Sequence, residues 1–108
     1  MNSQKPQMTE LCELVAQWAD NRGLLQPENA NRQFLKVAEE LGELAAGMAR
    51  QREDEIVDAL GDVFVTLVIL SHQLGWRPEV ALEVAYNEIK NRTGKTVNGV
   101  FIKDIERR

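Results

Sequence analysis

The sequence predicts an all-α, four-helix bundle-like fold in a single domain that spans residues 1–108. Four segments repeat apolar residues every three or four positions, which is the period of one helix face. Short links that contain glycine, proline or charged residues separate these segments, as they separate the helices of a bundle. A chain of 108 residues forms one core and has no room for a second.

The first two helices are expected on either side of the link "NRGLLQPEN". The first begins at the capping residue Thr9 and runs to about Asn21, with Gly23 as its C-terminal cap. The second covers residues 29–50 and follows Pro27. Its apolar residues form the stripe Phe34, Val37, Ala38, Leu41, Leu44, Ala45 and Met48.

The third helix, expected over residues 54–74, is apolar around most of its circumference. Five of its polar residues form one narrow strip: Glu55, Asp58, Asp62, Thr66 and Gln73. A helix that is apolar nearly all round is a buried helix. A chain of this size has little means of surrounding such a helix, so we expect a homodimer or homotetramer whose interface uses it.

The fourth helix is expected to start at Pro78, in a first turn that suits proline, and to end near Asn91. The remaining residues carry turn signals at Thr93-Gly94 and Asn98-Gly99. They predict a loop followed by a short extended or helical tail.

Charge is distributed unevenly along the chain. Residues 39–62 hold eight acidic residues against Arg50 and Arg52, whereas residues 1–38 are neutral and residues 63–108 carry a small positive excess. The overall charge of −4 argues against nonspecific nucleic-acid binding.

The N-terminus has no signal-peptide pattern and no apolar run is long enough for a membrane span, so we expect a cytoplasmic protein. The single Cys12 excludes an intramolecular disulfide and is expected as a small core residue.

Two groups of carboxylates lie on consecutive helices. Glu39, Glu40 and Glu43 share one broad side of the second helix, and Glu55, Asp58 and Asp62 share a strip of the third. If the two helices pair in antiparallel fashion, the groups face each other and repel unless a cation neutralises them. Oxygen ligands of this kind suit Mg²⁺ or Mn²⁺ better than zinc or copper. The competing interpretation is that these acids are only the solvated faces of two helices.

The two acidic motifs together resemble those of the MazG-like nucleoside triphosphate pyrophosphohydrolases. This all-α superfamily also contains dimeric dUTPases and phosphoribosyl-ATP pyrophosphohydrolases. The first motif is "EELGE", residues 39–43, preceded by "QFLK"; the second is "EIVDALGDVFVTLVIL", which starts at Glu55. The later stretches "YNEIKNRTGK" and "VNGVFIK" are similar to those of short, single-domain, phage-type members.

The chain departs from the family pattern at one position. Many members have Glu-Glu-x-Gly-Asp where this chain has "DALGD", so Ala59 stands three residues before Asp62 in place of an acid. Either Asp58 substitutes for that acid beside Asp62, or the working pair is Glu55 and Asp58. Both alternatives stay open at the level of the sequence.

The resemblance implies hydrolysis of nucleoside triphosphates to the monophosphate and pyrophosphate, with Mg²⁺ as cofactor and Mn²⁺ as a possible substitute. Under it Glu39 is the candidate catalytic base, and the metal ligands are Glu40, Glu43, Glu55, Asp58 and Asp62. The residues expected to bind substrate are Lys36, Asn87, Lys90, Asn91, Arg92 and Lys95. Two alternatives are a helical assembly module without catalytic activity, and a pyrophosphohydrolase of the same superfamily acting on a substrate such as phosphoribosyl-ATP.

Overall fold

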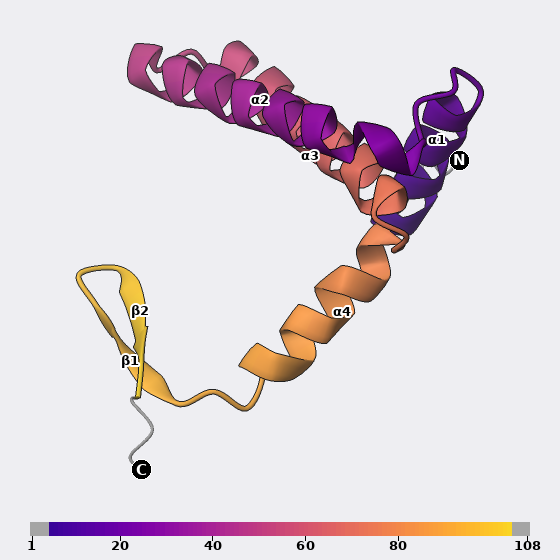
Figure 1. The fold of residues 1–108 in the computed structure, drawn as a ribbon. Helices are drawn as coiled ribbons and strands as arrows, with labels where there is room; N and C mark the ends of the chain where they lie inside the picture. Colours follow the sequence, from indigo (N-terminus) through magenta and orange to yellow (C-terminus); the bar gives the residue numbers. More distant parts are fainter. Residues whose placement is uncertain (1–4, 105–108) are drawn as a thin grey trace. The chain divides into compact units, whose positions relative to one another are not determined.

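The computed structural model describes residues 5–104 and confirms the four predicted helices. Their ends lie within two residues of those expected. The elements are α1 (Met8–Asp20), the 3-10 helix η1 (Pro27–Asn29), α2 (Ala30–Arg50), α3 (Glu53–Gln73), α4 (Pro78–Ile89), β1 (Gly94–Val97) and β2 (Val100–Lys103). The described residues divide into two compact units, one that ends at Pro78 and one that begins at Glu79 (Figure 1).

The beginning of α1 differs from the expectation. The sequence predicts Thr9 as the cap, but the helix starts at Met8, with Gln7 at the capping position. The backbone N–H of Gln7 donates a hydrogen bond to Oε1 of Glu10 at 2.8 Å. A glutamate three residues after the cap stabilises this start because it satisfies an N–H group that has no partner inside the helix.

The helices α1, α2 and α3 end in the same type of turn. After α2, Gln51 adopts a left-handed conformation with φ of 56°, and its N–H and that of Arg52 donate to carbonyls in the last turn of the helix at 3.1 and 3.2 Å. The same pair of hydrogen bonds closes α1 and α3, where Gly23 and Gly75 have φ of 69° and 91°. The predicted cap Gly23 lies in the turn that closes α1, but the C-cap position of the helix is Asn21. Gln51 adopts the left-handed conformation despite its side chain.

The centre of the first unit is the antiparallel pair of α2 and α3, which lie side by side (Figure 1). Only Gln51 and Arg52 connect them. At one end of the pair, Nε2 of Gln33 donates to the carbonyl oxygen of Thr66 at 3.1 Å. At the other end Gly47 is buried, and a Cβ atom placed on it would lie 3.4 Å from Cβ of Glu55. These two contacts set the register of the pair.

Packing divides the predicted apolar stripe of α2. Val37 is buried and Leu44 is half-buried, but Phe34, Leu41 and Met48 are between 51% and 60% exposed. The predicted amphipathic stripe is therefore present, but only part of it faces the core of the first unit. Successive residues of a helix are rotated by about 100° about its axis. Side chains next to those that contact α3 therefore point away from α3 and reach the surface.

The polar strip of α3 is also divided. Thr66 and Gln73 are buried, although they continue the strip that carries the acids. The hydroxyl of Thr66 donates a hydrogen bond to the carbonyl oxygen of Val63 at 2.9 Å. Nε2 of Gln73 donates a hydrogen bond to the carbonyl oxygen of Leu24 at 2.8 Å. Two of the five residues of the strip therefore bind backbone carbonyls, and the other three are the acids.

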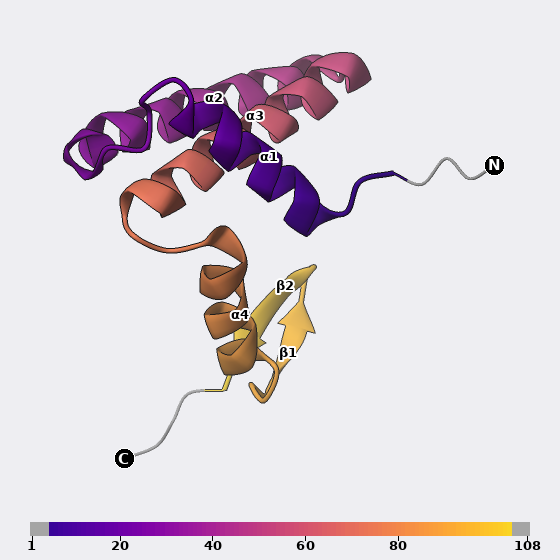
Figure 2. The same cartoon turned by 90° about the vertical axis from the view of Figure 1, so that its right-hand side faces the viewer.

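Helix α1 packs against α3 and crosses the α2–α3 pair (Figure 2). Its buried residues are Cys12 and Ala19, so the expectation of a core cysteine is confirmed. An ion pair at 3.4 Å joins Glu13 on α1 to Arg77, which follows α3. None of the helices among the described residues combines the length and the apolar character that a membrane span requires.

The second unit consists of the rest of α4 and an antiparallel hairpin, which replaces the predicted loop and short tail. Val97 pairs with Val100, and the two-residue turn between them has positive φ at both Asn98 and Gly99, 52° and 80°. Asn-Gly favours this turn because both residues tolerate positive φ. The fold is therefore mainly helical, with one small sheet. Every described residue from Val80 onward is exposed, so this unit has no core of its own.

We expect Val37→Ala to destabilise the first unit more than Leu35→Ala, although the leucine loses more atoms. Val37 is buried and its truncation leaves a cavity, so the free energy of unfolding of the Val37→Ala protein should fall by about 1–3 kcal/mol. Leu35 is 63% exposed, and its truncation should change stability by less than about 0.5 kcal/mol. Urea unfolding followed by circular dichroism measures both values, and the reverse order would contradict the described packing.

Candidate active site

A cavity of about 590 Å³ lies between α2 and α3 and is lined by carboxylates from both helices. We call it the carboxylate cavity; its lining residues are Glu40, Glu43, Arg50, Glu55, Asp58, Ala59 and Asp62. All of them belong to the first unit. The five acids are the five predicted metal ligands, and the structure brings them to one cavity.

The geometry of the helix pair explains this gathering. Glu40, Glu43 and Arg50 are separated by three and seven residues and therefore share one side of α2. On α3, Glu55 and Asp62 are separated by seven residues, which also places them on one side. Because α3 runs back along α2, the end of α2 lies next to the beginning of α3.

Burial differs among the lining residues. Ala59 is 6% exposed, Glu40 and Glu55 are half-buried, and Glu43, Asp58 and Asp62 are exposed. Ala59 is the position at which many members of the resembled family have an acid. Its small side chain therefore contributes space to the cavity and no ligand.

Ion pairs separate Glu55 from the other four acids. Its Oε1 atom lies 3.1 Å from Nη1 of Arg50, and its Oε2 atom lies 3.8 Å from Nε of Arg52. Within residues 5–104, no ion pair is found for the remaining acids of the cavity, which are Glu40, Glu43, Asp58 and Asp62. Four mutually repelling carboxylates therefore share the cavity without a paired cation among those residues.

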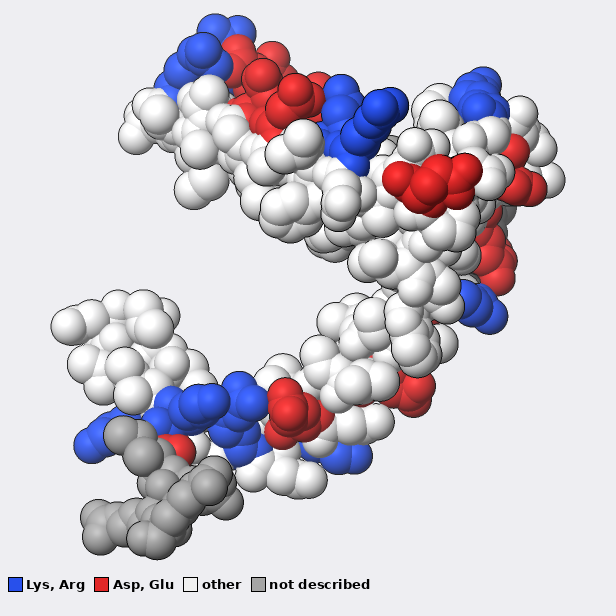
Figure 3. All heavy atoms as spheres, viewed as in Figure 1, with Lys and Arg blue, Asp and Glu red and all other residues white. Residues whose placement is uncertain are grey.

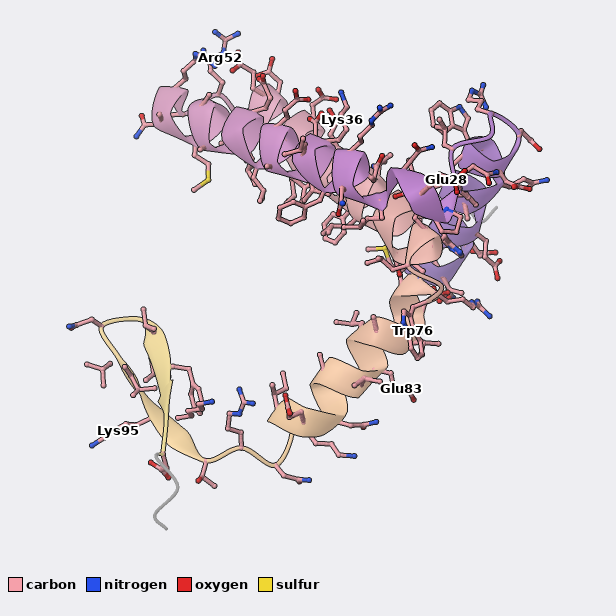
Figure 4. The ribbon with its side chains drawn as sticks, viewed as in Figure 1. Glu28, Lys36, Arg52, Trp76, Glu83 and Lys95 are labelled. Carbon is pink, nitrogen blue, oxygen red and sulfur yellow. The ribbon has the colours of Figure 1, made fainter. Side chains whose placement is uncertain are left out.

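Basic side chains stand on both sides of the acids. Figure 3 shows acidic atoms gathered along one edge of the α2–α3 pair with basic atoms to either side, while the opposite edge of the pair is uncharged in this view. Lys36 and Arg52 project from the acidic edge (Figure 4). Arg52 also lies 3.8 Å from Asp54.

Glu39, the predicted base, lies outside the carboxylate cavity. It is exposed and forms an ion pair with Lys36 at 3.2 Å. Lys36 is a predicted substrate-binding residue, and in this structure its nearest acidic partner is Glu39 and not a residue of the cavity.

The other predicted substrate-binding residues belong to the second unit. Asn87 lies on α4, Lys95 lies on β1, and Lys90, Asn91 and Arg92 lie between them. All five are exposed. Arg92 forms an ion pair at 3.5 Å with Glu88, one turn earlier in the chain.

The donor chemistry of the cavity fits a divalent cation, because oxygen ligands alone are what Mg²⁺ and Mn²⁺ prefer. As the side chains of residues 5–104 are placed, no three acidic, histidine or cysteine side chains stand close enough together to hold a metal ion. The acids therefore need to converge when a cation binds. The ion pair between Glu55 and Arg50 opposes this convergence.

Sequence reasoning missed Arg50 as a residue of the site. Its spacing of seven residues from Glu43 returns it to the same side of α2, and only two residues separate the helices. If the antiparallel pairing of the two helices is assumed, this spacing and the short link between the helices are sufficient to place Arg50 among the acids.

These features define a class of protein: a mainly helical chain in which acids of two antiparallel helices line one cavity suited to a hard cation. The chain belongs to the MazG nucleotide pyrophosphohydrolase domain family, whose model matches residues 26–101. Membership confirms the resemblance read from the two acidic motifs. The family generally depends on a divalent metal.

One similar protein is an uncharacterized 18.2 kDa protein from the rep-hol intergenic region of Haemophilus phage HP1 (strain HP1c1). It is 41% identical over 66 residues, which make up 61% of this chain and 40% of the phage protein. The chain thus aligns with less than half of that relative. No solved structure matches the chain significantly.

In metal-free buffer we expect Glu43→Gln to raise the melting temperature by about 1–4 °C, because it removes repulsion of a few tenths of a kcal/mol per pair of acids. Glu28→Gln is the control, since Glu28 lies on η1 outside the cavity, and its change should stay within about 1 °C. Differential scanning calorimetry in EDTA measures both. An equal or lower melting temperature for Glu43→Gln would show that the acids do not repel appreciably.

Proposed function

We propose that the protein is a Mg²⁺-dependent pyrophosphohydrolase that converts (deoxy)nucleoside triphosphates to the monophosphate and pyrophosphate, with Mn²⁺ able to replace Mg²⁺. The observation that carries the proposal is the carboxylate cavity, formed from both acidic motifs in a chain that belongs to the MazG family. We further propose a role in limiting aberrant nucleotides in the cytoplasm.

The acids of the cavity would hold the metal. Glu40 and Glu43 on α2 and Asp58 and Asp62 on α3 are the first ligands in this proposal, because they have no ion pair among the described residues. Glu55 joins them only after it leaves Arg50. When bound, the metal would neutralise charge on the triphosphate and make a coordinated water more acidic.

Glu39 is the proposed base. An acid that is not a metal ligand remains available to take a proton, and Glu39 lies on α2 beside Glu40 but outside the cavity lining. The oxygen of water would form a bond to the α-phosphorus, and the bond from that phosphorus to the bridging oxygen would break and release pyrophosphate. The proton of the water would pass to Glu39.

Phosphate groups need cations in addition to the metal. Lys36 is the proposed contact from α2, since it projects from the acidic edge (Figure 4). The second unit would supply the contacts Asn87, Lys90, Asn91, Arg92 and Lys95. The family match crosses from the first unit into the second, which supports the proposal that both units work as one domain.

We also propose that the protein is a homodimer or homotetramer. The edge of the α2–α3 pair opposite the acids exposes an apolar face, which we define as Phe34, Leu41, Met48, Val57, Leu60, Phe64 and Leu67. These residues recur every three to seven positions on α2 and α3 and so form two adjacent stripes. Exposed apolar faces of this extent mark interaction surfaces. The same face supports the alternative of an assembly module without catalytic activity.

The catalytic proposal predicts that Mg²⁺ raises the melting temperature and that a panel of dNTPs and NTPs releases pyrophosphate and not phosphate. Glu43→Gln and Asp58→Asn should each lower kcat/KM by at least about 100-fold, because loss of a metal ligand exceeds the 10–100-fold effect of outer-shell changes. Coupled assays for pyrophosphate and for phosphate, with phosphoribosyl-ATP included as a substrate, provide the measurement.

Glu28→Gln is again the control and should retain wild-type turnover. Full activity in both cavity variants would refute the site while leaving the fold untouched. Absence of turnover on every substrate, together with no stabilisation by Mg²⁺, would favour the assembly module.

For the assembly, we expect Leu41→Glu to reduce the oligomer to a monomer, because it buries a charge in an apolar interface. Leu35→Glu is the matched control on the same helix: Leu35 is similarly exposed, 63% against 51%, but lies outside the apolar face. Sedimentation velocity measures the mass of each variant. A monomeric wild-type protein, or an intact Leu41→Glu oligomer, would contradict the proposal.

A further inference from the structure

Arg50 is the basic residue that lines the carboxylate cavity. It is the last residue of α2, and its Nη1 atom donates a hydrogen bond to Oε1 of Glu55 at 3.1 Å. The function proposed above requires the acids of this cavity to bind a cation. A cation supplied by the protein itself therefore already neutralises one of the five acids of the cavity, Glu55.

The backbone holds Arg50 and Glu55 close together. The turn at Gln51 reverses the chain within two residues, and Gly47 leaves room for the start of α3, since a Cβ atom at position 47 would lie only 3.4 Å from Glu55. The positive charge lies at the C-terminal end of α2 and the negative charge lies in the first turn of α3. Both positions favour those charges through the helix dipoles, so the pair is stabilised by more than its own contact.

The neighbouring basic residues differ from Arg50. Arg52 is 3.8 Å from Glu55 and also 3.8 Å from Asp54, and it does not line the cavity. Lys36 pairs with Glu39. Arg50 and Arg52 have nearly equal side-chain exposure, 60% and 59%, so they differ in position more than in solvation.

We propose that Arg50 is a positioning residue that acts through Glu55. It serves as the resident counter-ion of the metal-free cavity and weakens divalent-cation binding, because the cation must displace it from Glu55 and overcome its charge. The inference rests on the proposed function. It also assigns Glu55 a different role from the other four acids, as the ligand that is recruited last.

The test measures binding of Mn²⁺ alone, without nucleotide, by electron paramagnetic resonance on the full chain. Arg50→Gln should bind Mn²⁺ at least about threefold more tightly than wild type, as expected from the loss of an exposed ion pair. Arg50→Lys keeps the charge and should stay within about twofold of wild type. Arg32→Gln should do so as well; it is the control for net charge, because Arg32 lies on α2 but does not line the cavity. In a Glu55→Gln background, the effect of Arg50→Gln should shrink, because the residue acts through Glu55.

Unchanged or weaker binding in Arg50→Gln would overturn the inference, as would an equal gain in Arg32→Gln. If wild type binds Mn²⁺ and turns over nucleotide but Arg50→Gln binds no more tightly, only the inference fails. If wild type binds no Mn²⁺ and shows no turnover, the proposed function fails.

A measurement on wild type alone guards against a misfolded variant. The side-chain N–H signals of Arg50 should shift during Mg²⁺ titration in NMR spectra, and static signals would also overturn the inference.

Discussion

The antiparallel pairing of α2 with α3 is the constraint on which the rest of the first unit depends. A turn of only Gln51 and Arg52 connects two helices of 21 residues each, so the end of one helix must lie beside the beginning of the other. The buried Gly47 lets them approach closely at that end, and the hydrogen bond from Gln33 to the Thr66 carbonyl holds the far end. A shift by one residue would rotate side chains by about 100° and separate the acids.

This pairing gives the helix pair two unlike edges. Residues just to one side of the contact are acids that line the carboxylate cavity, and residues just to the other side are large apolar side chains such as Leu41 and Phe64. Both edges are unfavourable in an isolated chain: the acids repel one another and the apolar side chains meet water. A bound cation and a second copy of the chain would relieve these two costs independently.

Much of the site was predictable because helical periodicity is local. Glu40 and Glu43, or Asp58 and Asp62, share a side of their helix whatever surrounds it, and the family motifs depend on that spacing. The division of Thr66 and Gln73 from the acids of the same strip was not predictable. It depends on partners from distant parts of the chain: Gln73 donates to the carbonyl of Leu24, and the carbonyl of Thr66 accepts from Gln33. The predicted base Glu39 and the phosphate contacts of the second unit remain proposals.

The sequence by itself determined the helices to within two residues, the Asn98-Gly99 turn and the family, because capping, periodicity and turn preferences act over a few neighbouring residues. Only the tertiary structure decided which apolar residues of α2 are buried, that Ala59 leaves space in the cavity, and that Arg50 holds Glu55. These outcomes follow from the rotation and register of one helix against another. Packing across the whole pair sets both, and no short stretch of sequence encodes them.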